Sequence, residues 1–235
     1  MIKTVFFDLD GTLLPMDYEK FMKAYFKGLV KKASLRDYEP NKLIDTIWKG
    51  TYAMVKNDGS KLNEEVFWEV FKSVYGEEAL KDKELFDSYY YSEFKECRAC
   101  CGFEEKVKEI IDFLKSKNID LVLATNPLFP SHAQEERLSW TGATKDDFKY
   151  ITSYSNSSFC KPNPSYFKEI LNKLNIDPST TLMVGNDLVE DTACLKAGID
   201  IYIVGNSLLN LDKVDINKFK HGSYEDLLNY LKENI

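Results

Sequence analysis

Short apolar segments alternate with helix-type patterns over the second half of the chain, and this alternation constrains the fold more than any other sequence feature. Residues 119–125, 181–185 and 201–204 are apolar runs of strand length. Apolar residues spaced for one face of a helix lie between these runs. Strands and helices that alternate over short connections predict a parallel sheet covered on both faces.

Val5, Phe6 and Phe7 form a first apolar segment, and Asp8 follows them directly. A short apolar run that ends in a polar, glycine-containing stretch is typical of a buried strand with a loop at its carboxyl end. A short strand is also expected over residues 150–153, and the last strand is expected at 201–204. Helices are expected over 132–140, from Asn163 with proline after it, from Val189 to a C-terminal Gly198, and from Ser223.

A long helical stretch over residues 17–97 interrupts this alternation directly after the first strand. It has no convincing strand pattern, and apolar residues at helical spacing predict about four helices, the first over 19–33. The stretch is too long and too regular to be a loop. We therefore predict a helical domain of residues 17–97, inserted into an α/β core domain built from residues 1–16 and 98–235.

Composition places the chain among ordinary globular proteins. Its 235 residues include 31 Lys and Arg against 38 Asp and Glu, a formal net charge of −7. This acidic balance argues against a nucleic-acid or anionic-membrane binder, because both need broad basic faces. No apolar stretch reaches membrane-spanning length, and the amino terminus lacks a signal-peptide pattern, so we expect a cytoplasmic location. The five cysteines are odd in number and unevenly spaced, as expected of reduced thiols.

Polar residues with chemical potential follow several of the predicted strands. In an open parallel sheet, ligands bind at the carboxyl ends of the strands. The residues that fall at such ends, or just before a helix, are Asp8, Asp10, Thr125, Asn126, Lys161, Asp187 and Asp191. Several carboxylates in one place repel one another unless a cation neutralises them, and oxygen ligands alone favour Mg²⁺.

These motifs, in this order, resemble the four motifs of the haloacid dehalogenase-like hydrolases. The resemblance rests on DLDGTL at residues 8–13, on Thr125, on Lys161 and on the acidic run at 185–191. It covers essentially the whole chain. It implies a three-layer, Rossmann-like α/β core with a parallel sheet, and it identifies the helical insertion as an all-helical cap of the C1 type.

The resemblance also implies a role for each matching residue. Asp8 is the expected nucleophile, forming an aspartyl-phosphate, and Asp10 is the expected general acid and base. Thr125 and Lys161 are expected to bind or neutralise the phosphoryl group. The remaining implied roles are phosphoryl or substrate binding for Gly11 and Asn126, and Mg²⁺ binding for Asp8, Asp10, Asp187 and Asp191.

The fourth motif departs from the commonest form of the family. Where many relatives have Gly-Asp, this chain has Gly185, Asn186 and Asp187. Either Asn186 occupies the usual metal-ligand position, or Asp187 takes it through an offset of one residue. We favour Asp187 on sequence grounds, because a carboxylate holds Mg²⁺ better than an amide does.

A carboxylate at Asp10 separates branches of the resembled family, since dehalogenases and phosphonate-cleaving relatives lack an acid there. The leading hypothesis is therefore an Mg²⁺-dependent phosphatase that acts on a small phosphorylated metabolite. The alternatives are a phosphomutase of the β-phosphoglucomutase type and a non-catalytic module that is phosphorylated on Asp8 or only binds ligands. The sequence leaves the oligomeric state open, and a monomer is compatible with it.

Several other residues are expected to be structural. Glu190 is expected to be an ordinary acid in the first turn of a helix, and His132 and His221 are expected to be bystanders. The aromatic residues of the helical insertion are expected to form its core rather than a substrate platform; they include Trp48, Phe67, Phe71 and Tyr89. The sequence does not show which side chains of the insertion face a substrate.

Overall fold

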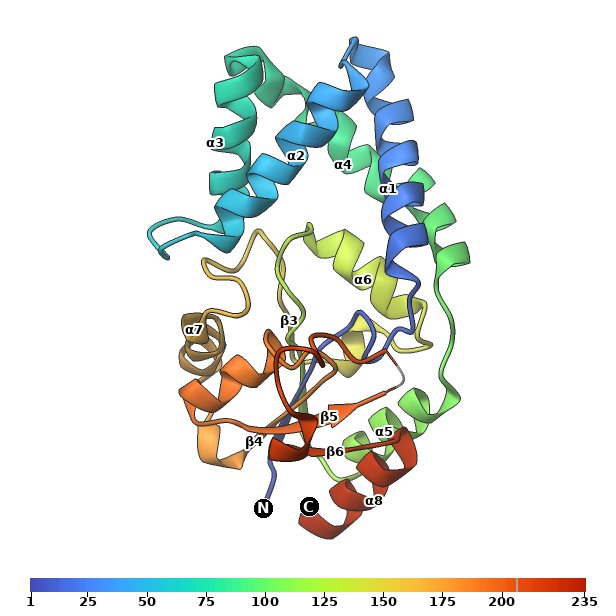
Figure 1. The fold of residues 1–235 in the computed structure, drawn as a ribbon, viewed down its shortest axis with the longest axis vertical. Coiled ribbons are helices and arrows are strands. Elements are labelled where there is room, and N and C mark those ends of the chain that lie inside the picture. Colours follow the sequence, from blue (N-terminus) through green and yellow to red (C-terminus); the bar gives the residue numbers. More distant parts are fainter. Residues whose placement is uncertain (206) are drawn as a thin grey trace.

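A six-stranded parallel sheet forms the centre of the lower part of the molecule in Figure 1, a computed structural model that describes residues 1–205 and 207–235. The strands are β1 (Thr4–Phe7), β2 (Asp120–Leu123), β3 (Tyr150–Ile151), β4 (Thr181–Gly185), β5 (Asp200–Val204) and β6 (Lys220–Gly222). Their order across the sheet is β3-β2-β1-β4-β5-β6, and every pair is parallel. The first strand is therefore central, with its carboxyl end between those of β2 and β4.

Helices cover both faces of the sheet, which gives three layers. Helices α5 (Glu105–Ser116) and α8 (Tyr224–Asn234) pack on the face to which Val5 and Phe7 point. Helix α7 (Pro164–Leu174) and the 3₁₀ segment η6 (Asp191–Ala197) pack on the other face, against Phe6. Side chains alternate between faces along a strand, and burial on both faces explains its unbroken apolar sequence. The predicted α/β fold class is confirmed.

The chain between β1 and α5 is helical and lies above the carboxyl ends of the strands (Figure 1). Its elements are α1 (Tyr18–Ala33), η1 (Ser34–Arg36), α2 (Pro40–Val55), α3 (Asn63–Tyr75), η2 (Glu77–Asp82), α4 (Lys83–Tyr91) and η3 (Glu93–Cys100). The four predicted α-helices are confirmed. The domain limits of 17–97, and of 1–16 with 98–235, stay a prediction, since η3 runs across the expected boundary.

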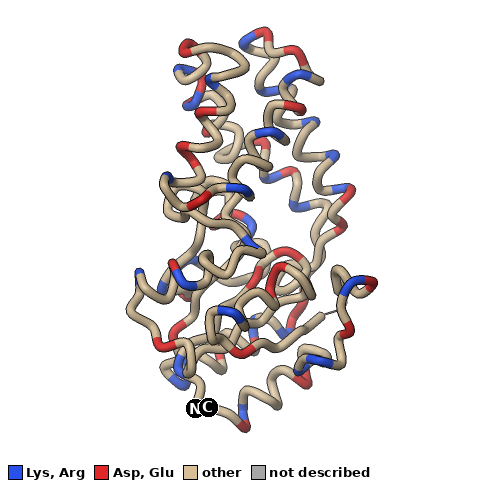
Figure 2. Tube along the Cα trace, turned by 60° about the vertical axis from the view of Figure 1, so that its left-hand side comes forward, with Lys and Arg blue, Asp and Glu red and all other residues tan. Residues whose placement is uncertain are grey.

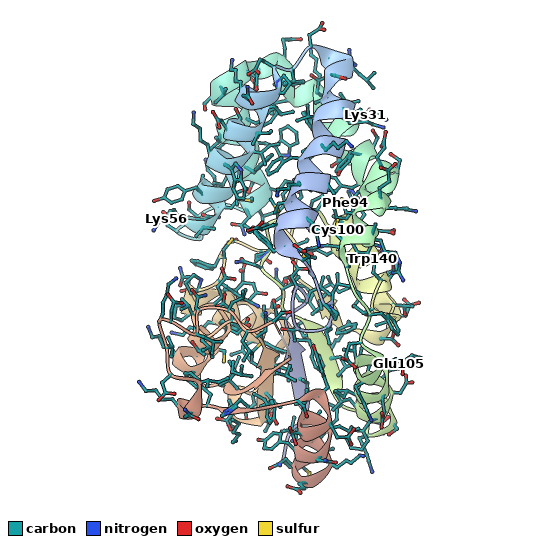
Figure 3. All side chains as sticks on the ribbon, turned by 45° about the vertical axis from the view of Figure 1, so that its right-hand side comes forward. Lys31, Lys56, Phe94, Cys100, Glu105 and Trp140 are labelled. Carbon is teal, nitrogen blue, oxygen red and sulfur yellow. The ribbon has the colours of Figure 1, made fainter. Side chains whose placement is uncertain are left out.

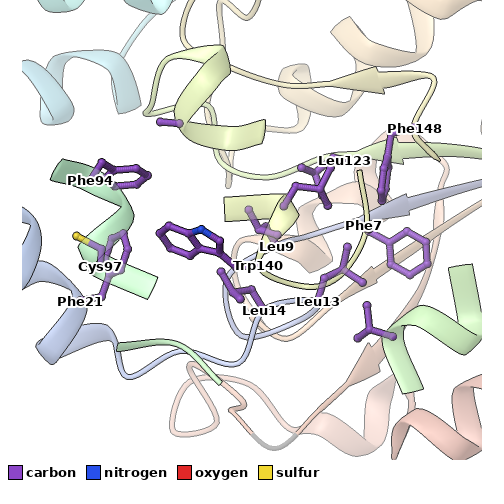
Figure 4. Packing of buried hydrophobic residues seen from close by; sticks show 14 of the residues in the cluster. Phe7, Leu9, Leu13, Leu14, Phe21, Phe94, Cys97, Leu123, Trp140 and Phe148 are labelled. Carbon is purple, nitrogen blue, oxygen red and sulfur yellow. The ribbon is translucent and has the colours of Figure 1, made fainter. Parts of the chain in front are cut away.

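A packed aromatic junction connects this helical part, which we call the cap, to the sheet. Phe94 is fully buried and lies 5.6 Å, ring centroid to centroid, from Trp140, which directly follows α6 (Ser131–Ser139). Figure 3 places Phe94, Cys100 and Trp140 at the level where the two parts meet. In Figure 4, Trp140 lies between Phe94 of the cap and Leu14 beyond the first strand. One hydrophobic cluster therefore extends from the cap into the core.

Local sequence signals set the helix starts. The Asp17 side chain accepts a hydrogen bond from the Lys20 backbone N–H at 3.1 Å, and Asn163 caps α7 in the same way. Ser223 and Asp226 form a reciprocal capping box at α8. Each cap satisfies a backbone N–H that has no partner inside the helix. The predicted helix starts at Asn163 and Ser223 are confirmed.

Three expectations about individual elements are wrong. The expected last strand at 201–204 is followed by β6, whose residues Lys220, His221 and Gly222 carry no apolar strand pattern. The segment before Gly198 is a 3₁₀ helix rather than an α-helix, although Gly198 ends it at a φ of +84° as expected. The strand expected at 150–153 has two residues, Tyr150 and Ile151, and a turn begins at Tyr154.

Lys and Arg alternate with Asp and Glu along both parts of the molecule in the view of Figure 2. This agrees with the net charge of −7. Within the described residues, no helix combines the length and apolar character that crossing a bilayer demands. The remaining short segments are η4 (Lys145–Asp147), η5 (Pro178–Thr180) and η7 (Ile216–Lys218).

Candidate active site

A buried lysine joins two carboxylates at the carboxyl edge of the sheet. Lys161 Nζ lies 2.8 Å from Asp8 Oδ1 and 2.7 Å from Asp191 Oδ1, and the lysine side chain has no exposed surface. Burial alone would lower the pKa of Lys161, but the Asp191 and Asp8 carboxylates raise it well above its ordinary value. Lys161 is therefore a permanent positive charge next to Asp8.

Asp191 shapes the loop that follows β4 as well as pairing with Lys161. Its Oδ2 accepts hydrogen bonds from the backbone N–H groups of Asn186 and Asp187, both at 3.0 Å. A Cβ at position 185 would overlap the Asp191 carboxylate, so the strand end requires glycine there. Both Asp191 oxygens thus accept hydrogen bonds from the protein, and Asp191 supports Lys161 and the loop after β4. Its expected role as a metal ligand stays a prediction.

Thr12 connects Asp8 to the loop after β4. Its hydroxyl oxygen lies 3.3 Å from Asp8 Oδ2 and 3.1 Å from Asn186 Oδ1, and all three side chains are buried. Gly11, at a φ of +85°, leaves the space that the Asn186 amide fills, and any Cβ there would overlap that amide. Asn186 therefore lies at the site of Asp8 and is held there by the turn after β1.

The Asp187 carboxylate accepts hydrogen bonds from its own loop and from Asn210 and, in the part of the chain that the structure describes, none from the turn after β1 that holds Asn186. Its Oδ1 accepts from the backbone N–H groups of Val189 and Glu190 at 2.7 and 2.9 Å. The Asn210 side-chain amide donates to the same carboxylate at 2.8 Å. Asp187 lines the cavity described below, but its contacts are those of a loop cap. The geometry thus favours Asn186 over Asp187 for the fourth-motif position, the reverse of the preference based on sequence.

Asp10 forms an ion pair with Arg137 of α6. The guanidinium Nη1 donates to Asp10 Oδ2, and Nη2 donates to Gln134 Oε1. The Arg137 guanidinium carbon also lies 4.5 Å from the centroid of the Phe129 ring. Burial raises the pKa of the Asp10 carboxyl above its ordinary value, and the guanidinium opposes that rise. Asp10 is therefore held in one orientation, with a buried Oδ1 that has no partner within the described residues.

Thr125 and Asn126 lie where β2 ends, beside the same site. Thr125 is buried and lines the cavity, and Thr152 and Tyr166 donate to its backbone oxygen at 2.7 and 2.8 Å. Asn126 Nδ2 donates to Glu190 Oε2 at 3.0 Å. Burial raises the pKa of Glu190 to about 7. The sequence-based view of Glu190 as an ordinary helix acid therefore misses its contact with the site.

The site offers a hard cation a small number of protein oxygen ligands. Asp8 supplies a carboxylate and Asn186 an amide oxygen, and the two are linked by Thr12. Among the described residues, no three His, Cys, Asp or Glu side chains gather as a metal cluster. Mg²⁺ uses one or two carboxylates, accepts neutral oxygens and keeps several waters, so this donor set fits it. The Asp10 backbone carbonyl is the further protein oxygen that the family resemblance implies.

A cavity of about 500 Å³ lies between the cap and these residues. Asp8, Asp10, Thr125 and Asn186 are on its sheet side. Aromatic side chains from α1, α2, α3 and α4 form its cap side. Trp48, Phe67 and Phe71, expected to be only structural, are among them, although Phe71 is almost fully buried. The wall of the cavity is thus also the edge of the aromatic core of the cap.

These features define a class of α/β hydrolases with a helical insertion after the first strand. The family model of the haloacid dehalogenase-like hydrolases matches residues 2–198, and the chain belongs to that family. The resemblance found in the sequence is confirmed.

Two solved structures and one curated relative show how broad this similarity is. The chain is 29% identical over 228 residues to the glyceraldehyde 3-phosphate phosphatase of Methanothermobacter thermautotrophicus, which covers 93% of this chain and 92% of that protein. A β-phosphoglucomutase from Clostridium difficile is 20% identical with a TM-score of 0.58, and 100% and 97% of the two chains are covered. YfnB from Bacillus subtilis, crystallised with magnesium, is 21% identical with a TM-score of 0.56 over 98% of each chain. The two structures share the fold of this chain.

Sequence reasoning missed three residues of the site. Thr12 could have been identified from the sequence, because it belongs to the DLDGTL motif itself. Arg137 carries no local signal, since an arginine on an amphipathic helix is usually exposed. Glu190 meets Asn126 only through the three-dimensional arrangement of two strand ends.

Proposed function

We propose that this protein is an Mg²⁺-dependent phosphatase that hydrolyses a small phosphomonoester through an aspartyl-phosphate on Asp8. The observation that carries the proposal is the buried ion pair of Lys161 with Asp8 at the floor of the cavity. An ammonium group beside a carboxylate nucleophile lowers the repulsion between that nucleophile and an incoming phosphate dianion.

Asp8 is the nucleophile in this proposal. Its carboxylate oxygen forms a bond to phosphorus while the bond from phosphorus to the leaving alcohol oxygen breaks. Lys161 offsets the negative charge that gathers on the phosphoryl oxygens, and Thr125 donates a hydrogen bond to one of them. Water then attacks the phosphorus of the aspartyl-phosphate, which releases phosphate and restores the Asp8 carboxylate.

Asp10 moves the protons in both steps. It gives a proton to the leaving oxygen in the first step and takes one from the attacking water in the second. Burial raises its pKa, which favours the protonated form that the first step needs. Arg137 holds the carboxylate in place, so that little motion is required at the moment of transfer.

Asp8, the Asp10 carbonyl and Asn186 would hold the Mg²⁺ ion, with Asp187 as the alternative to Asn186 and Asp191 as a support. When bound, the ion supplies charge compensation and orientation for the phosphoryl group. Bound magnesium in the related YfnB structure supports the choice of cation. The phosphatase name of the relative from Methanothermobacter thermautotrophicus supports the reaction type.

The test is a phosphate-release assay on a broad panel of phosphomonoesters, with Mg²⁺ and with EDTA. We expect release with Mg²⁺, none with EDTA, and a loss of at least about 1,000-fold in Asp8→Asn. Asp112→Asn, an exposed carboxylate on α5, is the matched control and retains activity. Full activity of Asp8→Asn, or of the chelated enzyme, refutes the proposal. Interconversion of sugar phosphates without net phosphate release would favour the mutase instead.

A further inference from the structure

The cap side of the cavity is aromatic, and this composition bears on the substrate of the proposed phosphatase. Phe26 of α1 and Trp48 of α2 face each other with ring centroids 5.6 Å apart, and both line the cavity. Phe67 and Trp68 of α3 add two further rings, with centroids 5.6 Å apart. A volume of about 500 Å³ exceeds what a three-carbon alcohol and a phosphate group need.

The charges around the cavity are distributed unevenly. Among the described residues that line it, the cap contributes one charged side chain, Asp87 of α4. Arg137 is the only cationic one, and it is already paired with Asp10. Lys161 lies below the floor, paired with Asp8 and Asp191. No lysine or arginine of the described cap lining is therefore present to pair with a second anionic group of a substrate.

We propose that the leaving alcohol of the substrate is uncharged and carries an aromatic ring that packs against the cap wall at Trp48. A carboxylate, or a second phosphate group, on the substrate would lose its hydration in the cavity without gaining a counter-ion, and it would face the negative charge of Asp87. An aromatic ring loses little by leaving water, and it gains offset-stacked or edge-to-face contacts with the wall. The inference rests on the proposed phosphatase function and narrows its substrate class.

Trp48 is the most exposed aromatic side chain of α2 that lines the cavity. It is 44% exposed, so truncation removes less buried packing there than at Phe71, which is 1% exposed. Tyr52 lies one turn further along α2, is 65% exposed and does not line the cavity. Trp48→Ala and Tyr52→Ala are therefore a matched pair that differ in access to the substrate.

The experiment compares kcat/KM for benzyl phosphate, 4-carboxybenzyl phosphate and glycerol 3-phosphate, with acetyl phosphate as a small reference substrate. We expect benzyl phosphate to exceed glycerol 3-phosphate by about 10- to 100-fold, from burial of one ring. The added carboxylate lowers kcat/KM by about 100-fold. Trp48→Ala lowers kcat/KM for benzyl phosphate by about 2- to 10-fold relative to acetyl phosphate, whereas Tyr52→Ala does not.

A kcat/KM for 4-carboxybenzyl phosphate that equals or exceeds that for benzyl phosphate overturns the inference and leaves the phosphatase function intact. Absence of phosphate release from all three esters and from acetyl phosphate, an acyl phosphate, counts against the phosphatase function. Calorimetric binding of benzylphosphonate and methylphosphonate tests the cavity independently of turnover. Tighter binding of benzylphosphonate, weakened by Trp48→Ala, supports the inference, and equal binding of the two phosphonates refutes it.

Discussion

Replacement of Lys161 by methionine tests whether the buried ammonium group holds the site together. The change keeps most of the apolar stem and removes the charge. Asp191, 1% exposed, then keeps a buried negative charge without a counter-ion, and Asp8, 12% exposed, loses its partner as well. Removal of one partner from a buried ion pair costs about 3–5 kcal/mol. We expect Lys161→Met to lower the free energy of unfolding by that amount.

A second substitution separates the charge effect from lost packing. Asp191→Asn in the Lys161→Met background removes the uncompensated carboxylate, while the amide oxygen still accepts from the backbone N–H groups of Asn186 and Asp187. We expect the double variant to regain about 1–2 kcal/mol over Lys161→Met. Phosphatase activity is expected to stay at least about 100-fold below that of the native protein, because the cation beside Asp8 is still absent.

The assay is urea unfolding followed by tryptophan fluorescence, in EDTA so that no divalent cation binds at Asp8. The chain has three tryptophans, which report on both parts of the molecule. If Lys161→Met stays within about 1 kcal/mol of the native protein, or if Asp191→Asn destabilises it further, the charge argument is wrong. Recovery of activity in the double variant would contradict the assigned role of Lys161.

Three further substitutions test other contacts. Phe94→Ala is expected to lower the free energy of unfolding by about 3–5 kcal/mol. The control Phe103→Ala, at a site 54% exposed, is expected to change it by less than about 1 kcal/mol. Equal effects of the two substitutions in urea unfolding would contradict the buried junction. Asn186→Asp should lower the Mg²⁺ concentration for half-maximal activity by about 10-fold. A larger effect of Asp187→Asn on that concentration would return the metal role to Asp187. Arg137→Met should reduce kcat by about 10-fold or more, and Arg137→Lys should restore part of it; an unchanged kcat in Arg137→Met shows that Asp10 needs no such partner.

Hydrophobic periodicity was sufficient to predict the strands from β1 to β5 and the helical character of residues 17–97. The segment Val5–Phe7 is apolar at every position because both of its faces are buried, and such runs are visible in a sequence. Strand β6 could not be predicted this way. Lys220 and His221 are exposed, and the strand forms because its backbone pairs with β5 at the sheet edge.

Part of the candidate site could also be predicted from the sequence. The place of Asp8 was predicted from strand-end logic, and the family resemblance implied that Lys161 lies near it; the structure brings Lys161 Nζ within 2.8 Å of Asp8 Oδ1. The sequence-based preference for Asp187 over Asn186 rests on ligand chemistry, which favours the carboxylate, whereas the loop directs Asp187 Oδ1 to backbone amides. Which of the two side chains binds the metal stays a prediction. A preference based on side-chain type cannot include the direction in which a turn points that side chain.

The aromatic junction at Phe94 and Trp140 has a thermodynamic consequence. The same apolar cluster includes Leu29 of α1 and Leu227 of α8, which belong to opposite ends of the molecule. Loss of order in either part exposes apolar surface of the other, so the two melt together. Scanning calorimetry of the intact chain should therefore record a single heat-absorption peak with equal van't Hoff and calorimetric enthalpies. The helical segment expressed alone should remain without fixed tertiary structure, since it depends on the sheet for a share of its interior.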